Sequence, residues 1–371
     1  MINISHIHTD KKIESEVRKV LSSGFLVQGE KVREFEKKLC KLNKTKYAIM
    51  VNSGTAALHT ALVSSGIGAG DEVITTPFSF IATVNTILMC GAKPIFVDID
   101  EEKFMINPDL IEEKITSRTK AILTVDLYGQ ACDYEKIRKI AKKHKLKIIS
   151  DSCQAIGVQY KKKPISYWAD VVCFSFYATK NITTGEGGAL VTDDPRVFEY
   201  ARRFRQHGQD MEKPYVYHHI GYNYRSTDIL ASIGLVQLKF LKKWSVKRYK
   251  NAKLLISKLK KVKGVRVPNL PEFGAHVFHQ FTIRVTEDFS LIRDQLKSYL
   301  LESGIRTGVY YPSVLAKVEY IQKITQYKKG MYPVAEKAAV EVLSLPVHPY
   351  LREVDVNKIV SAIKKAANEK K

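Results

Sequence analysis

Hydrophobic positions gather into short apolar runs that alternate with amphipathic stretches over the first part of the chain. The runs lie at 46–51, 72–76, 94–98, 120–126, 147–151, 170–176 and 188–192. Amphipathic segments such as 134–144 separate several of them. Strands that are apolar throughout and are separated by helices indicate a parallel sheet with both faces covered. The pattern therefore predicts an α/β fold with a mainly parallel seven-stranded sheet flanked by helices.

The pattern changes after about residue 240. Residues 235–262 predict one long basic helix that links two domains and ends before Gly264 and Pro268. A strand at 277–285, a helix near 289–303 and a terminal helix at 354–369 predict a smaller α+β unit. We expect a large domain over residues 1–240 and a small C-terminal domain over residues 241–371. The first ~15 residues are expected to pack on the small domain.

Composition and charge exclude several classes of protein. The formal net charge is +22, and its lysines are spread along the chain, which suits attraction of an anion, or simple solubility, better than a nucleic-acid arm. No run of about 18 apolar residues occurs, so we expect no membrane span. The start MINISHIHTDKK lacks the pattern of a signal peptide, and the five cysteines occur singly. We therefore expect reduced thiols, a cytoplasmic protein and no metal site.

Candidate chemistry lies where the predicted strands end, because ligands of parallel sheets bind outside the carboxyl ends of the strands. The stretch NSGTAAL at 52–58 opens a helix whose free N–H groups suit a phosphate, although an ordinary helix cap has the same sequence. Asp151 closes a buried strand, a place where aspartate also commonly caps a turn. Ser175 and Lys180 end the next strand. A phosphate seat, a carboxylate and an amine thus meet at one edge of the sheet.

Pyridoxal phosphate (PLP) gives these three groups a common purpose. The cofactor needs an amine for its Schiff base, a carboxylate that keeps its ring nitrogen protonated and an anion site for its phosphate. Lys180 would be the amine, since a buried lysine loses its proton readily. The flat ring also needs an apolar face, and Phe80 lies at another strand end.

These motifs, in this order and spacing, closely resemble the sugar aminotransferases of the DegT/DnrJ/StrS family, which are PLP enzymes of fold type I. The matching stretches cover nearly the whole chain. They are LVQGEKVREFEKKL (26–39), NSGTAAL (52–58), TTPFSFIATVN (75–85), DSCQAIG (151–157), FSFYATKNITTGEGGAL (174–190), IGYNYRSTD (220–228), YYP (310–312) and LSLPVHP (343–349).

The resemblance implies a role for each matching residue. Lys180 would hold the cofactor and move the proton, and Asp151 would pair with the ring nitrogen. The remaining cofactor contacts would be Phe80 stacking on the ring, Gln154 at the phenolic oxygen, Gly54, Thr55 and Ser175 at the phosphate, and Asn223 reaching the phosphate of the neighbouring subunit.

The same resemblance implies the substrates and the assembly. The expected reaction moves an amino group from L-glutamate to a keto group of a nucleotide-linked sugar, in a homodimer with shared active sites. Tyr310 and Tyr311 would contact the sugar, although relatives often carry histidine at the position of Tyr310. Two alternatives remain: a PLP enzyme of another reaction class, such as a cyclitol aminotransferase or a sugar dehydratase, or a non-catalytic regulatory protein on the same fold. Lys180 favours amino transfer, because the dehydratases of the family replace that lysine with histidine.

Overall fold

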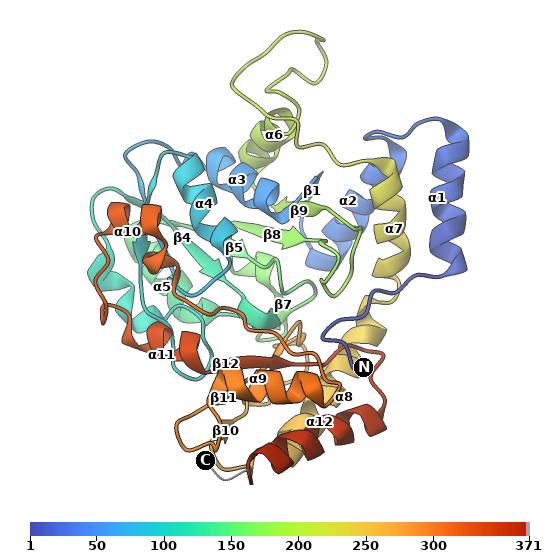
Figure 1. The fold of residues 1–371 in the computed structure, drawn as a ribbon. Coiled ribbons are helices and arrows are strands. Elements are labelled where there is room, and N and C mark those ends of the chain that lie inside the picture. Colours follow the sequence, from blue (N-terminus) through green and yellow to red (C-terminus); the bar gives the residue numbers. More distant parts are fainter. Residues whose placement is uncertain (369–371) are drawn as a thin grey trace.

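Helices cover both faces of a seven-stranded sheet in the computed structural model, which describes residues 1–368 (Figure 1). The strand order is β1-β9-β8-β5-β4-β2-β3, and only β9 runs antiparallel to its neighbours. The predicted α/β class and the mainly parallel sheet are confirmed. The strands are β1 (Tyr47–Val51), β2 (Glu72–Thr75), β3 (Lys93–Phe96), β4 (Thr119–Val125), β5 (Lys147–Asp151), β8 (Val171–Ser175) and β9 (Gly188–Thr192).

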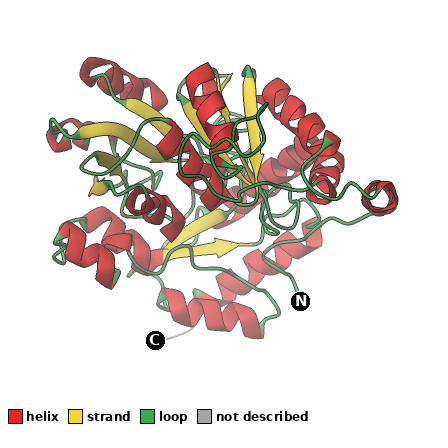
Figure 2. Ribbon diagram, turned by 90° about the horizontal axis from the view of Figure 1, so that it is seen from above, coloured by secondary structure: helices red, strands yellow, loops and turns green. Residues whose placement is uncertain are grey.

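Figure 2 shows helices on both sides of the strands. Two hydrophobic clusters fill the spaces between the sheet and these helices. One cluster packs α3, α4 and α6 on one face, and the other packs α2, α5 and α7 on the opposite face. The strands are buried on both faces, which explains why their sequences are apolar throughout. The helices of this layer are α1 (Lys11–Ser23), α2 (Glu30–Asn43), α3 (Gly54–Ser64), α4 (Ile81–Met89), α5 (Tyr134–His144), α6 (Pro195–Phe204) and α7 (Asp228–Leu238).

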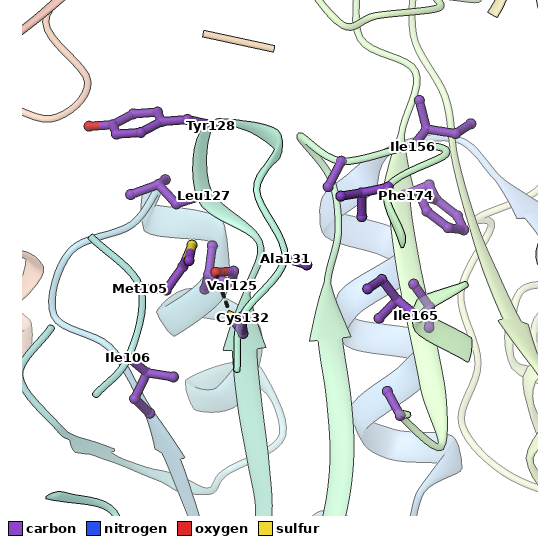
Figure 3. Close-up of a cluster of buried hydrophobic side chains, with 14 of the residues drawn as sticks. Met105, Ile106, Val125, Leu127, Tyr128, Ala131, Cys132, Ile156, Ile165 and Phe174 are labelled. Carbon is purple, nitrogen blue, oxygen red and sulfur yellow. Dashed lines mark hydrogen bonds between the residues drawn. The ribbon is translucent and has the colours of Figure 1, made fainter. Parts of the chain in front are cut away.

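The cluster beneath α5 reaches the carboxyl ends of the strands. Figure 3 shows Val125 and Leu127 at the end of β4, with Phe174 of β8 across from them. The thiol of Cys132 donates to the carbonyl oxygen of Val125 at 3.2 Å, which ties the loop after β4 back to its strand. Tyr128 is a buried member of the same cluster, and Figure 3 shows it in the loop that follows Leu127.

A second, three-stranded sheet with the order β10-β11-β12 has its own hydrophobic cluster. Ile2 joins this cluster, and its backbone N–H donates to the carbonyl of Gly304 at 2.8 Å. The elements here are β10 (Val265–Arg266), β11 (Phe281–Val285), β12 (Val342–Leu345), α8 (Leu241–Leu259), α9 (Arg293–Glu302) and α12 (Glu353–Ala366).

Short elements complete the fold. They are β6 (Gln159–Tyr160), β7 (Lys163–Pro164), α10 (Glu319–Thr325), α11 (Pro333–Glu341) and the 3-10 helices η1 (Pro108–Leu110), η2 (Glu112–Lys114), η3 (Leu127–Gly129), η4 (Ile165–Tyr167) and η5 (Leu315–Lys317). Between residues 1 and 368, none of the helices combines the length and the apolar character that a membrane crossing requires.

The prediction of a single helix over 235–262 is wrong, because the structure has two helices, α7 and α8, with a break between them. The N–H of Phe240 bonds to a carbonyl three residues back, which tightens the end of α7. The buried Gln237 side chain accepts from the N–H of Thr183 at 3.1 Å and donates to the carbonyl of His8 at 2.9 Å. These bonds hold α7 on the large sheet. The start of α8 joins the same cluster through Leu241 and Trp244, and the rest of α8 packs against the smaller sheet.

The strand predicted at 277–285 begins only at Phe281. Upstream of it, the N–H of Val277 donates to the carbonyl of Gly129 at 2.8 Å, and that of Gln280 donates to the carbonyl of Tyr128 at 3.2 Å. This segment is therefore bonded to the loop after β4 instead of to the small sheet. The terminal helix ends at Ala366, and residue 369 of its predicted range lies outside the described residues.

The segment after α9 returns to the large sheet. Buried residues from Val314 to Ala339 belong to the same cluster as α2 and α7. Asp98, which follows β3, accepts from the N–H groups of Val334 and Ala335 at 3.0 Å each and thereby caps the start of α11. The division of the chain at residue 240 stays a prediction.

Asp228 holds α2 against α7. Its carboxylate accepts three backbone N–H bonds, from Gly29 at 2.8 Å, Val32 at 3.0 Å and Lys31 at 3.1 Å. The carboxylate is buried and sits at the N-terminus of α2, where an anion is stabilised. It replaces the side-chain cap that Gly29 cannot supply.

We expect Asp228→Ala to lower the free energy of unfolding by about 2–3 kcal/mol, because buried N–H groups would lose their acceptor. Asp10→Ala removes a similar cap from the exposed start of α1 and should cost about 1 kcal/mol. Urea denaturation followed by circular dichroism measures both, with Asp228→Asn, which keeps one acceptor oxygen, expected to lie between wild type and Asp228→Ala. Equal losses for the two alanine variants would show that α2 does not depend on the buried cap.

Candidate active site

One cavity of about 330 Å³ lies at the carboxyl ends of the strands and contains all but one of the predicted site residues. Because β1, β8, β5 and β2 are parallel, the segments that follow them meet at the same edge of the sheet. The predicted residues that line the cavity are Gly54, Thr55, Phe80, Asp151, Gln154, Ser175, Lys180, Tyr310 and Tyr311.

The N-terminus of α3 forms one wall. Ser53 caps this helix, and its hydroxyl accepts from the N–H of Ala56 at 3.1 Å. A Cβ added to Gly54 would lie 2.8 Å from the Cβ of Ser175 and 3.0 Å from the sulfur of Cys153, so the helix start comes this close to β8 only as glycine. Free N–H groups beside the Ser175 hydroxyl make a seat for an anion, as a phosphate group requires.

Asp151 forms the floor and is 6% exposed. Its Oδ2 accepts from the Thr83 hydroxyl at 2.8 Å, and its Oδ1 accepts from the N–H of Cys153 at 3.2 Å. Both donors are neutral, and the described residues form no ion pair with this carboxylate. A buried carboxylate without a cationic partner is costly. Its remaining acceptor capacity therefore fits a group with a positively charged N–H, such as the protonated ring nitrogen of PLP.

The Thr83 hydroxyl has a second partner. It lies 2.8 Å from the Ser79 hydroxyl, and both side chains are buried. A hydroxyl has one proton to donate, so Thr83, which donates to Asp151, accepts from Ser79. The two hydroxyls thus form a short chain that fixes the orientation of the Asp151 carboxylate.

Lys180 follows β8 after a short turn in which its N–H donates to the carbonyl of Tyr177 at 2.9 Å. Burial holds the pKa of Lys180 below its ordinary value, against the opposing effect of Cys153 and Asp151. A lowered pKa increases the fraction of neutral amine near pH 7. Lys180 therefore has the properties of a nucleophilic amine at the cavity.

Gln154 joins two other walls of the cavity. Its Oε1 accepts from the N–H of Tyr128 at 2.8 Å, and its Nε2 donates to the hydroxyl of Tyr311 at 3.1 Å. The Tyr128 hydroxyl donates in turn to the carbonyl of Tyr310. Burial raises the pKa of Tyr311, so its hydroxyl stays protonated near neutral pH. These contacts fix the YYP segment over the cavity.

Phe80 lies at the mouth of the cavity, at the residue before α4. Its side chain is 54% exposed, and its ring centroid lies 6.1 Å from that of Tyr311. An exposed aromatic ring at a cavity mouth offers the apolar face that a flat cofactor needs.

Several residues of the site were missed by the sequence reasoning. Thr83 and Ser79 are four residues apart in the quoted motif TTPFSFIATVN, a spacing that signals one side of a helix start. His279 and Gln280 line the cavity too, although their segment was interpreted as strand. Burial and the charges of Lys180 and Arg248 hold the pKa of His279 well below its ordinary value, so its ring is neutral.

Asn223 does not line the cavity of its own chain. It is exposed, and its backbone carbonyl accepts from the side-chain amide of Asn52 at 3.2 Å. The part of the chain that the structure describes contains no group of three or more histidine, cysteine, aspartate and glutamate side chains that could hold a metal ion.

Comparison with known proteins gives matches over nearly the whole chain. The model of the DegT/DnrJ/EryC1/StrS aminotransferase family matches residues 8–364. A protein of Geobacillus stearothermophilus named pleiotropic regulatory protein is 40% identical over 93% of this chain and 91% of its own length. A GDP-perosamine synthase of Caulobacter vibrioides is 38% identical over 90% of each chain.

Solved structures also match nearly the whole chain. DesV of S. venezuelae, in complex with a ketimine intermediate, superposes with a TM-score of 0.91 and is 33% identical, covering 97% of this chain and 95% of its own. NtdA of Bacillus subtilis, with bound cofactor PMP, gives a TM-score of 0.90 and 33% identity over 97% of this chain and 82% of its own. The fold and the cofactor class thus have direct counterparts among solved structures.

Proposed function

This chain belongs to the DegT/DnrJ/EryC1/StrS aminotransferase family and is a PLP-dependent sugar aminotransferase, and we propose that it moves an amino group from L-glutamate to the keto group of a nucleotide-linked sugar. The observation that carries the proposal is the single cavity that holds Lys180, Asp151 and the N-terminus of α3. The name of the GDP-perosamine synthase supports a nucleotide-linked acceptor. We place the enzyme in the cytoplasm, in keeping with its five unpaired cysteines.

PLP, when bound, supplies an aldehyde that condenses with an amine and a ring that takes up an electron pair. We assign Lys180 as the amine that holds it and Asp151 as the partner of the ring nitrogen. Thr83 occupies one lone pair of Asp151 Oδ2, which leaves the carboxylate oriented and able to accept one further N–H. Phe80 and Gln154 would position the ring from its face and its edge.

Two further roles follow from the cavity. The N–H groups of Gly54 and Thr55, with the hydroxyls of Thr55 and Ser175, would donate to the cofactor phosphate. Lys180 would also act as the base that accepts a proton from the donor's α-carbon, because it lines the same cavity and burial lowers its pKa, which favours the neutral form of Nζ. The same Nζ, then protonated, would return a proton on the acceptor half of the reaction.

The charges of the cavity bear on its substrates. Glutamate carries carboxylates and a nucleotide-linked sugar carries a diphosphate, yet Lys180 is the one lysine or arginine in the cavity's described lining. Binding of either substrate needs further cations or N–H donors. We propose that the partner subunit of a homodimer supplies them, together with Asn223.

The loop between α6 and α7 is placed for such a contact. It projects from the body of the molecule above α6 (Figure 1). Tyr215 is 84% exposed and Ile220 is 83% exposed, and such apolar exposure marks an interaction surface. Asn223 follows directly and is exposed as well. We propose that this loop crosses to the neighbouring subunit.

The function is tested by absorbance spectra. We expect L-glutamate to convert the PLP form to the pyridoxamine form, and one keto sugar linked to dTDP, UDP or GDP to convert it back. The same keto sugar without its nucleotide is the matched control and should react much more slowly. Equal reaction of the free sugar, or of a cyclitol ketone, would contradict a nucleotide-linked acceptor.

The carboxylate assignment is tested at Asp151 and Thr83 together. Asp151→Asn should keep the cofactor but lose about 10²–10³-fold in kcat, since a neutral amide does not stabilise the protonated ring nitrogen. Thr83→Val should lose about 10- to 100-fold, the worth of one hydrogen bond to a charged group, and Thr83→Ser should restore the rate. The pH titration of the bound cofactor's absorbance should shift in the same order.

A structural role for Asp151 predicts something else. In that case Asp151→Asn would retain near-wild-type turnover and an unchanged cofactor titration, and only its thermal stability would fall. That result would contradict the pairing of Asp151 with the ring nitrogen.

The shared site is tested by mixing two variants that we expect to be poorly active, Lys180→Ala and Asn223→Ala, the second because it should weaken phosphate binding. If Asn223 serves the partner's lysine, a heterodimer has one site with both lesions and one with none. Activity should then rise on reassembly, towards half the wild-type rate per heterodimer. If Asn223 acts in its own chain, each site keeps one lesion and mixing restores nothing.

A further inference from the structure

A second cavity, of about 770 Å³, lies on the outer side of the α2 and α7 layer. Its walls come from α1, α2, α7 and the start of α8, and from the loops at residues 157–159 and 273–277. It shares no lining residue with the catalytic cavity. Its volume falls in the range of pockets that enclose small organic ligands, roughly 300–1,000 Å³.

Apolar side chains make up much of the lining. Phe273 is 49% exposed, which leaves an aromatic ring open at the cavity wall. The aliphatic side chains in the lining are Leu42, Leu235, Val236, Leu238, Leu241 and Val277. This composition suits the ring or chain of an organic molecule.

Five lysines also line this cavity, which we call the lysine-rimmed cavity. They are Lys31, Lys38, Lys41, Lys239 and Lys242. The first three share one face of α2, at spacings of seven and three residues.

Most of this positive charge is unpaired. Glu16 and Glu34 also line the cavity, each 3.7 Å from Lys31, so five lysines against two carboxylates leave the lining a net charge of +3. Within residues 1–368 the other four lysines form no ion pair. Like charges gathered around one hollow repel each other, so a bound anion would be stabilised there.

We propose that the lysine-rimmed cavity binds an amphiphilic organic anion, with its phosphate or carboxylate on the lysines and its ring or chain on the apolar wall. A segment of a second copy would fit this rim only if it presented carboxylates to the lysines, which a small anion does directly. An uncharged ligand would leave the lysines unmatched. The lysines of the lining match the charge of such an anion, and the apolar side chains match its ring or chain.

The cavity is best tested with the catalytic site filled. Its wall residues His276 and Val277 lead directly to His279 and Gln280 of the catalytic cavity. A probe in solution must therefore not be able to enter through the catalytic site. PLP fills the cofactor part of the catalytic site, and the two triple variants below distinguish probe in the lysine-rimmed cavity from probe in the rest of the catalytic site.

The probe is 8-anilinonaphthalene-1-sulfonate, an aromatic anion whose fluorescence rises in apolar surroundings. We expect saturable binding to the loaded wild-type protein. The triple variant Lys38→Glu, Lys41→Glu, Lys242→Glu should bind at least about tenfold more weakly. Lys297→Glu, Lys358→Glu, Lys364→Glu makes the same charge change on exposed positions of α9 and α12 and should bind as wild type does.

Two more measurements test separately how the anionic group and the apolar body of the ligand contribute to binding. The uncharged analogue N-phenyl-1-naphthylamine should bind the wild type more weakly than the sulfonate and should not respond to the triple variant. Phe273→Ala should weaken the sulfonate without altering the salt dependence. Displacement by a nucleoside diphosphate or by dodecanoate then distinguishes a nucleotide from an acyl chain as the natural source of the anion.

The proposal is overturned by any of three results. These are no saturable binding to the wild type, equal affinity in the two triple variants, or displacement by inorganic phosphate as effective as by the organic anions. Probe binding at the exposed α6–α7 loop would appear as the second result, since that loop is unaffected by the substitutions on α2 and α8.

Discussion

The hydrogen-bond ladder that pairs β5 with β4 and β8 sets the position of every group at the active site. Asp151 lies opposite Val125 on one side and Cys173 on the other. A slip of one residue in this register would turn its side chain to the other face of the sheet. Because the strands are parallel and buried on both faces, their carboxyl ends form one edge. The phosphate seat, the carboxylate and the lysine therefore converge at that edge.

Buried carboxylates then fasten neighbouring elements to that sheet. Asp228 holds α2, Asp98 holds the start of α11, and Asp126 accepts from the N–H of Cys132 at 3.0 Å and from buried hydroxyls, one of them Ser150. Burial raises the pKa of Asp126, while those donors oppose the rise. Each of these carboxylates accepts hydrogen bonds, either from a segment distant in the chain or from a loop beside the active site. Removing such an acceptor would leave buried donors unsatisfied, which costs more than the bond itself contributes.

The catalytic cavity and the lysine-rimmed cavity differ in how much positive charge they contain. The chain carries a large excess of lysine, yet one lysine alone serves the described part of the catalytic lining. Five lysines surround the second cavity, and the loop between α6 and α7 stands away from the body with exposed aromatic residues. The catalytic lining of one subunit holds Lys180 with the carboxylates of Asp151 and Glu186, so it offers an anionic substrate little positive charge. The second subunit that we propose would supply the missing cations.

The sequence by itself determined the sheet strands, their parallel arrangement and the grouping of Gly54, Asp151 and Lys180 at one edge, because apolar periodicity and strand ends are local properties. It did not find the break between α7 and α8, because Gln237 bonds to Thr183, 54 residues away in the chain. The hydroxyl chain behind Asp151, the return of residues after 314 to the large sheet and the lysine-rimmed cavity were also decided by tertiary structure alone. Each depends on which distant segments pack together, and no local pattern records that.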